Sequence, residues 1–210
     1  MTSWSQIEGS PRPLGAVWLR EEQSYNFALY SRHATGVTLL LYTTRDLVNP
    51  LLRIPLSYVI HKSGRIWHCR LAADQIADAR YYAYSVEGPT DPHAERHFFD
   101  PDKVLLDPYA TSIYFPPNFR RIASVRRGSN AGRAPLGVLG DGPSSFDWIG
   151  EPRPAHTSDT IIYELHVRGF TRRSNSGVTA DKQGTYAGVI EKIPYLRELG
   201  ITAVELLNVA

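Results

Sequence analysis

The pattern that most constrains the fold lies in the last fifty residues, where a strand, a helix and a second strand follow one another. Residues 160–167 are rich in β-branched and aromatic residues, residues 186–199 repeat apolar side chains at helical spacing, and residues 201–209 are largely apolar. This order predicts a right-handed βαβ unit with parallel strands. Because two strands and one helix cannot bury both faces of a sheet, we expect the unit to be an incomplete part of a larger fold.

The predicted helix contains one interruption and one end signal. Val189, Ile193 and Leu196 share an apolar face, and Gly200 is placed to end the helix. Pro194 removes one backbone donor from its interior. We therefore expect a kink, or a restart with Pro194 in the first turn of a second helix.

The first ninety residues alternate between short β-rich stretches and turn formers. Tyr25, Phe27 and Leu29 fall on one face of a strand, whereas residues 37–42 are apolar throughout, as expected for a central strand covered on both faces. Strands at intervals of about 8–12 residues predict a mainly β fold, an immunoglobulin-like antiparallel sandwich. The predicted strands are residues 16–20, 25–31, 37–43, 52–60, 66–71 and 80–87.

Prolines and glycines punctuate the chain from Gly88 to about residue 157. A long stretch without secondary structure predicts a connector laid over a surface, anchored by the apolar pieces 104–106 and 113–115. The predicted organisation is a β-sandwich, a Pro/Gly/Arg-rich connector and an incomplete βαβ unit. Their ranges are 1–98, 99–157 and 158–210.

A local excess of positive charge lies in the predicted connector. There is no acidic residue between Asp107 and Asp141. An anion-binding patch is one interpretation, but the glycines and polar residues among the arginines favour a solvated segment. The overall net charge of +2 is too small to predict nucleic-acid or membrane binding, and no aromatic residue between Phe119 and Phe146 offers a platform for bases. The arginines are Arg120, Arg121, Arg126, Arg127 and Arg133.

Disulfides, metals and cofactors are not expected. Cys69 is the only cysteine, so neither an internal disulfide nor an all-cysteine zinc site can form. Residues 1–10 show no signal pattern and no apolar run approaches the ~20 residues that span a bilayer, which predicts a cytoplasmic protein. The histidines lack metal-ligand spacing; they are His33, His61, His68, His93, His97, His156 and His166.

Two sets of side chains invite a functional interpretation. Glu164 and Glu205 lie mid-strand on neighbouring predicted strands, but an ion-paired or hydrogen-bonded structural role is favoured over a catalytic pair. Their available partners are His166, Arg168 and Arg197. Aromatic residues of the sandwich can stack on the apolar face of a sugar, although core packing is favoured for any one of them. The aromatic candidates are Trp18, Trp67, Tyr30, Tyr42, Tyr82 and Tyr84.

A series of short motifs follows in order over nearly the whole chain. In the run at 106–110, Asp107 is expected to fix a turn by accepting backbone N–H bonds. The sandwich motifs are Pro-Leu-Gly-Ala at 13–16, Asn-Phe-Ala-Leu-Tyr-Ser at 26–31, Trp-His at 67–68, Tyr-Ala-Tyr-Ser-Val-Glu-Gly-Pro at 82–89 and Leu-Asp-Pro-Tyr-Ala at 106–110. The tail motifs are Tyr-Glu-Leu-His-Val-Arg-Gly-Phe-Thr at 163–171, Gly-Thr-Tyr-Ala-Gly at 184–188, Tyr-Leu-Arg-Glu-Leu-Gly at 195–200 and Val-Glu-Leu-Leu at 204–207.

In their order and spacing, these motifs resemble those of isoamylase-type glycogen-debranching enzymes of the α-amylase clan. The resemblance implies a carbohydrate-binding-type sandwich joined to a (β/α)₈ barrel. It also implies hydrolysis of α-1,6 branch points in glycogen, amylopectin or limit dextrins with retention of configuration, by two carboxyls about 5–5.5 Å apart. In the family the catalytic carboxylates belong to later barrel strands, so no catalytic residue is carried over and the chain alone is expected to be inactive.

The chain departs from the family at its end. The family usually continues Val-Glu-Leu-Leu-Pro-Val, whereas Asn208 replaces the proline and the chain stops at Ala210. This resembles the boundary of a cloned fragment, a frameshift or a degraded gene. The alternatives in function are a non-catalytic glucan-binding module, or the N-terminal part of a branching transferase or a trehalose-releasing hydrolase of the same clan.

Overall fold

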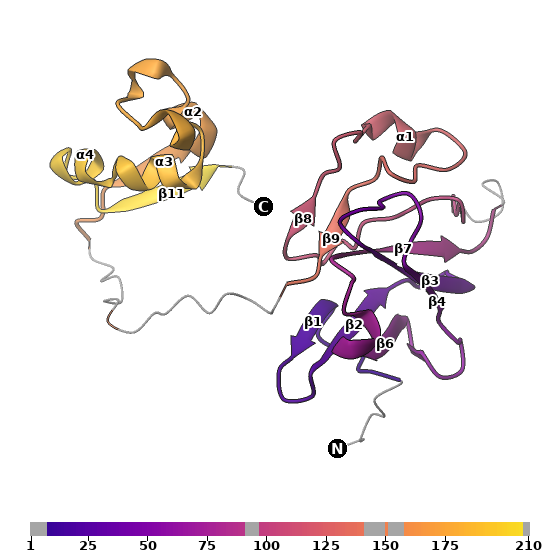
Figure 1. Ribbon diagram of the computed structural model, residues 1–210. Coiled ribbons are helices and arrows are strands. Elements are labelled where there is room, and N and C mark those ends of the chain that lie inside the picture. Colours follow the sequence, from indigo (N-terminus) through magenta and orange to yellow (C-terminus); the bar gives the residue numbers. More distant parts are fainter. Residues whose placement is uncertain (1–7, 91–96, 141–149, 151–157, 208–210) are drawn as a thin grey trace. The chain divides into compact units, whose positions relative to one another are not determined.

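The computed structural model describes residues 8–90, 97–140, 150 and 158–207. The chain divides into two compact units, Met1–Phe146 and Asp147–Ala210 (Figure 1). Across the described residues, no helix combines the length and the apolar composition needed to cross a bilayer.

The first unit is an antiparallel β-sandwich, as the sequence predicted (Figure 1). Its first sheet has the order β1-β2-β6-β5 and its second has the order β4-β3-β7-β9-β8. The strands of the first sheet are β1 Gly15–Leu19, β2 Ser24–Tyr30, β5 Lys62–Ser63 and β6 Ile66–Ala72. Those of the second are β3 Gly36–Tyr42, β4 Leu52–Pro55, β7 Tyr81–Glu87, β8 Ile113–Tyr114 and β9 Leu136–Val138.

The main core lies between the two sheets and is rich in aromatic residues. Phe27 and Trp67 of the first sheet pack with Leu39, Leu41 and Tyr82 of the second, and each is at most 1% exposed. Burying a large apolar side chain stabilises the fold by about 1.5–3 kcal/mol. These contacts therefore hold the two sheets together.

A second core covers the outer face of β3, as the apolar run 37–42 predicted. Leu40 and Tyr42 point away from the main core and pack against Val104, Ala134 and Leu136. All three covering residues come from the segment that we predicted to be a connector. The predicted end of the sandwich at residue 98 is therefore too early, because residues 99–139 complete its outer layer.

Backbone pairing also joins this segment to the sandwich. Leu105 exchanges two backbone hydrogen bonds with Tyr84, at 2.8 and 2.9 Å, and Tyr82 pairs with Gly137 of β9. A Cβ atom on Gly137 would collide with the Tyr82 ring, so this close approach requires glycine. The anchoring predicted for residues 104–106 and 113–115 is thus present, but as sheet pairing within the first unit.

Buried polar side chains fix the part of this segment that contains the short helix α1, Arg121–Val125. The Lys103 ammonium donates to the carbonyls of Ala123, Arg126 and Gly128. The Asn130 amide bonds both backbone groups of Val104. Charged and amide groups are retained inside a protein when they are hydrogen-bonded in this way.

The second unit contains the predicted parallel pair, β10 Ile162–His166 and β11 Ala203–Leu207. Leu165 is buried on one face, whereas Glu164, Glu205 and Leu207 are exposed on the other. One face of this sheet is therefore uncovered within the described residues. The helices are α2 Val167–Thr171, α3 Tyr186–Glu191 and α4 Ile193–Glu198, with 3₁₀ turns at Ser174–Ser176 and Ala180–Lys182.

The interruption at Pro194 takes the second of its two predicted forms. Helix α3 ends at Glu191, and α4 restarts with Pro194 in its first turn. Gly200 follows α4 with φ +85°, and its N–H donates to the Arg197 carbonyl. The predicted restart and glycine stop are both confirmed.

Candidate functional site

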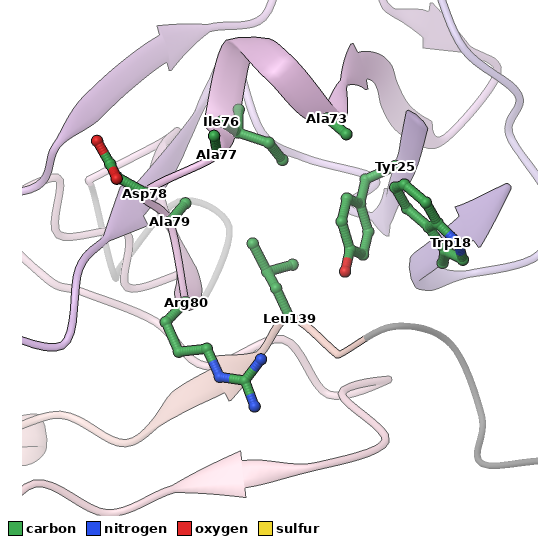
Figure 2. A pocket seen from close by; sticks show the side chains of 9 residues that line it. All are labelled: Trp18, Tyr25, Ala73, Ile76, Ala77, Asp78, Ala79, Arg80 and Leu139. Atoms are coloured by element: carbon green, nitrogen blue, oxygen red, sulfur yellow. The ribbon is translucent and has the colours of Figure 1, made fainter. Parts of the chain in front are cut away.

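The cavity of greatest functional interest in the first unit lies between the β1–β2 hairpin and the segment that leads into β7. It has a volume of about 530 Å³. That volume lies within the range of about 300–1,000 Å³ that is typical of small-molecule sites. The side chains that give it its chemistry are Trp18, Tyr25, Ile76, Asp78, Arg80 and Leu139 (Figure 2).

An aromatic pair forms one wall of this cavity. Trp18 and Tyr25 are cross-strand partners in the β1–β2 hairpin, so their side chains lie on the same face of the sheet. Their ring centroids are 4.9 Å apart and the ring planes are tilted by 54°. Both side chains are only half-buried. The pair thus offers an apolar, non-planar surface to a ligand.

The aromatic wall is fixed by contacts on its inner side. The Tyr25 hydroxyl donates to the Gly140 carbonyl at 2.5 Å. The Tyr25 ring also lies 6.0 Å from that of Phe27, which belongs to the main core. These contacts fix the position of the Tyr25 ring.

The rest of the cavity combines an apolar floor with a charged rim. Ile76, at the end of the 3₁₀ turn Ala73–Ile76, and Leu139 are 4% and 3% exposed. Asp78 and Arg80 are exposed side chains in the segment that follows the turn. An aromatic wall with nearby charged hydrogen-bonding groups suits a ligand that has both apolar faces and hydroxyl groups. Binding is the chemistry that this arrangement supports.

The six aromatic residues considered in the sequence divide into two groups. Trp67, Tyr42, Tyr82 and Tyr84 are each 1% exposed, which confirms the core packing favoured for them. Trp18 and Tyr30 remain accessible, and Tyr30 is 47% exposed. Sequence reasoning missed Tyr25 as the partner of Trp18. Folding the predicted hairpin about its turn would have placed the two rings opposite one another.

Asp107 fixes a turn, as predicted, and has a second role in the core. One carboxylate oxygen accepts a hydrogen bond from the Tyr109 N–H at 2.8 Å. The other accepts from the Tyr82 hydroxyl at 3.0 Å. Asp107 is 1% exposed, and burial raises the pKa of its carboxyl above the ordinary value. This motif serves the structure of the sandwich.

Glu164 and Glu205 are register partners in the parallel pair and are both exposed. A glycosidase acid needs an apolar environment that favours its protonated form, which an exposed carboxylate lacks. Of the predicted structural role, ion-paired or hydrogen-bonded, the ion-paired form is not seen for either glutamate among the described residues. Within the described residues, the two ion pairs are Arg70–Glu22 and Lys182–Glu191. His166 instead accepts a hydrogen bond from the Gly169 N–H at the start of α2.

The five arginines of the basic segment are all exposed. The Arg133 guanidinium donates to the Ser129 carbonyl, and within the described residues none of the five forms an ion pair with a carboxylate. Bonds of Lys103 and Asn130 join the segment to residues 103 and 104, and its arginines face solvent. This agrees with the solvated interpretation favoured from the sequence.

Comparison with known families gives a match for the sandwich. Residues 13–110 match the family described as carbohydrate-binding module 48, the isoamylase N-terminal domain. The matching stretch, residues 13–110, is called the family 48 module below. The match contains both walls of the cavity, the β1–β2 hairpin and residues 73–80, whereas Leu139 lies beyond it.

The similarity extends past the family 48 module to nearly the whole chain. The chain is 34% identical to isoamylase 1 of Oryza sativa subsp. japonica over 204 residues, which are 96% of this chain and 24% of the relative. It is 37% identical to the glycogen debranching enzyme of Yersinia enterocolitica, again over 96% of this chain and 30% of the relative. The chain thus spans less than a third of the length of each of these two relatives. The resemblance to isoamylase-type debranching enzymes is confirmed.

Solved structures show the same fold. The catalytic module of the glycogen-degrading pneumococcal virulence factor SpuA matches 96% of this chain and 27% of its own length, with a TM-score of 0.66 and 25% identity. The pullulanase SAP of group B Streptococcus, in complex with maltotetraose, matches 96% and 24% with a TM-score of 0.64 and 22% identity. In both structures, as in this chain, the sandwich fold is followed by the βαβ unit.

Other titratable groups of the family 48 module serve its structure. Cys69 is buried, which raises the pKa of its thiol to about 12 and keeps it protonated. His68 is fully buried, with ring nitrogens 2.6 Å from the Glu8 carbonyl and 2.9 Å from the Ser63 hydroxyl. Among the described residues, no three histidine, cysteine or acidic side chains gather as metal ligands. His93, His156 and Asn208 lie outside the described residues.

Proposed function

We propose that this chain is the N-terminal part of a debranching glycoside hydrolase that cleaves α-1,6-glucosidic branch points. The observation that carries the proposal is similarity to isoamylases and glycogen debranching enzymes over 96% of the chain. The family 48 match supports it independently for the sandwich. The parallel β10–β11 pair supports it for the tail, since a (β/α)₈ barrel begins with such a unit.

We further propose that the ligand of the family 48 module is an α-glucan such as glycogen, amylopectin or a limit dextrin. Relatives of this chain are named for glycogen debranching, and one similar structure holds maltotetraose. The half-buried aromatic pair of Trp18 and Tyr25 supplies a surface with the chemistry that sugar faces require.

The proposed reaction places its chemistry outside the described residues. Retaining hydrolysis uses one carboxyl as the nucleophile and a second as the acid and then the base. Glu164 and Glu205 are exposed to solvent, so we do not assign them these two roles. In the whole protein, the barrel strands that follow β11 are proposed to carry these groups, and the 210-residue chain is expected to be inactive.

Two assays test this proposal. The purified 210-residue chain is expected to release no reducing ends from glycogen, and release by it would contradict the placement of the catalytic groups. A protein expressed from a reading frame extended beyond codon 210 is expected to convert amylopectin to linear chains. Transfer of chains to new branch points, or release of trehalose, would instead support one of the other two reactions of the clan.

A non-catalytic glucan-binding role is the second candidate, and the cavity of the module favours it as a function of the isolated chain. Affinity electrophoresis in gels with and without glycogen measures it directly. Retardation of the 210-residue chain by glycogen would support glucan binding. Equal migration in the two gels would leave the module as a docking or spacing element of the hydrolase.

A further inference from the structure

We propose that the cavity between the β1–β2 hairpin and residues 76–80 is a subsite for an α-1,4-linked glucan chain. Trp18 and Tyr25 form its stacking wall, and Arg80 and Asp78 bind sugar hydroxyls at its rim. The class of ligand rests on the proposed function, whereas the location rests on the geometry of the cavity.

The accessibility of the aromatic pair is the first argument. The largest aromatic residues of the module's core, including Trp67, Tyr82 and Tyr84, are almost completely buried. Trp18 and Tyr25 are instead only partly buried and line a concavity. Core packing alone does not require two large rings to be left partly open on the same face of a hairpin.

The tilt of the two rings selects the shape of the ligand. Coplanar aromatic rings suit the flat ribbon of a β-1,4-linked glucan, whose sugar faces lie in one plane. The planes of Trp18 and Tyr25 meet at 54°, and Figure 2 shows the rings together at one side of the cavity, across from Ala77 and Arg80. Such a bent wall suits an α-1,4-linked chain, because its successive sugar rings turn relative to one another.

The polar groups complement the stacking wall. Arg80 is exposed on the opposite side of the cavity, and its guanidinium carries five N–H donors for sugar hydroxyls. Asp78 adds two acceptor oxygens at the rim. Between rim and wall, the buried side chains of Ile76 and Leu139 form an apolar floor. Stacking therefore accounts for affinity, while the rim orients the hydroxyl groups.

Contacts within the first unit hold the aromatic wall in this geometry. The Tyr25 hydroxyl is bonded to Gly140, and its ring contacts Phe27 of the core. Trp18 is fixed opposite Tyr25 by the strand register. A preorganised wall loses little side-chain entropy on binding, which favours affinity.

Isothermal titration of the 210-residue chain with maltoheptaose, with cellohexaose as the comparison sugar, tests the subsite. The wild-type chain is expected to bind maltoheptaose and to bind cellohexaose at least tenfold more weakly. Trp18→Ala is expected to weaken maltoheptaose binding at least tenfold, and Trp18→Phe by a smaller factor. Arg80→Ala is expected to weaken maltoheptaose binding severalfold. Because the Arg80 side chain is exposed, the melting temperature of the protein is expected to stay the same.

Tyr30→Ala is the matched control, because Tyr30 is an exposed aromatic residue on β2, outside the cavity. Its affinity is expected to stay within twofold of the wild type. If Trp18→Ala lowers the melting temperature strongly, the affinity of Trp18→Phe is compared with that of the wild type instead, because this variant retains an aromatic ring in the hairpin.

The outcomes separate this inference from the proposed function. Wild-type binding that Trp18→Phe and Arg80→Ala both leave unchanged would overturn the subsite and leave glucan binding by another surface. Failure of the wild-type chain to bind maltoheptaose would also overturn the subsite. The debranching proposal would then still stand or fall on the hydrolysis assay with the extended protein.

Discussion

Asp107 links the local chain path to the core of the sandwich. Its two carboxylate oxygens accept hydrogen bonds from the Tyr109 N–H and the Tyr82 hydroxyl. The local bond was predictable, because an aspartate before proline commonly organises a turn. The bond to Tyr82 was not, since it joins residues 25 positions apart and depends on how the segment after residue 98 packs.

Burial makes the stability contribution of Asp107 depend on pH. Burial raises the pKa of its carboxyl above 3.8, and the bonds from Tyr109 and Tyr82 only partly oppose this. The folded chain then holds a proton that the unfolded chain has released, so this group's contribution to stability falls as pH rises above about 4. Asp107→Asn removes the titration. We expect it to cost about 1 kcal/mol at pH 4 and less at pH 7.

Urea denaturation of both proteins at several pH values from 4 to 7 measures this difference. Tyr82→Phe is the comparison variant, because the bond that it removes strengthens when Asp107 is ionised; its cost should grow over the same range. A cost of Asp107→Asn that increases with pH would show that the hydrogen bonds outweigh burial.

At the scale of elements, periodicity located the long strands and missed the short ones. The predicted strands 25–31, 37–43 and 80–87 differ from β2, β3 and β7 by one residue at one or both ends. β5, β8 and β9 have two or three residues each, too few for an alternating pattern to appear. They are defined by their partners in the sheet, which a pattern along the chain does not contain.

Asn130 shows how a side chain can replace a strand partner. Its Oδ1 accepts from the Val104 N–H at 2.7 Å, and its Nδ2 donates to the Val104 carbonyl at 3.0 Å. Asn130→Ala leaves both groups of the buried Val104 without these bonds. We expect a loss of about 3 kcal/mol in the free energy of unfolding, since an unsatisfied buried group costs about 1–3 kcal/mol.

Hydrogen exchange gives an additional measurement of this anchor, with faster exchange expected at the Val104 amide in Asn130→Ala. Ser129→Ala is the matched control: the Ser129 hydroxyl accepts an exposed hydrogen bond from the Ala131 N–H, and its removal should change stability by less than about 0.5 kcal/mol. Equal exchange rates at the Val104 amide in the wild type and in Asn130→Ala would show that Asn130 does not anchor Val104.

At the scale of the whole molecule, the sequence predicted the two architectures but placed their boundary too early. Prolines and glycines made residues 99–139 look like a connector, because irregular chain and open linker share a composition. What separates them is the buried contact of Val104 and Leu136 with the outer face of β3. The candidate cavity was equally hidden, since Trp18 and Arg80 come together only through the sheet, although the hairpin partner Tyr25 was predictable.

The two units should differ in their ability to fold alone. The first buries two apolar clusters on either face of β3. Among the described residues of the second, the buried apolar side chains are Leu165, Val178 and Leu196, while Ile162 is 61% exposed on the open face of the β10–β11 sheet. A chain of about 50 residues with one covered sheet face buries too little apolar surface to offset its conformational entropy. We therefore expect residues 8–140 to unfold cooperatively and residues 158–207 to show no cooperative transition.

Thermal melts followed by circular dichroism measure the cooperativity of each fragment, and binding of a hydrophobic dye measures its exposed apolar surface. If residues 158–207 melt cooperatively as a monomer, the open face is tolerated and the unit does not need a further layer of polypeptide to be stable.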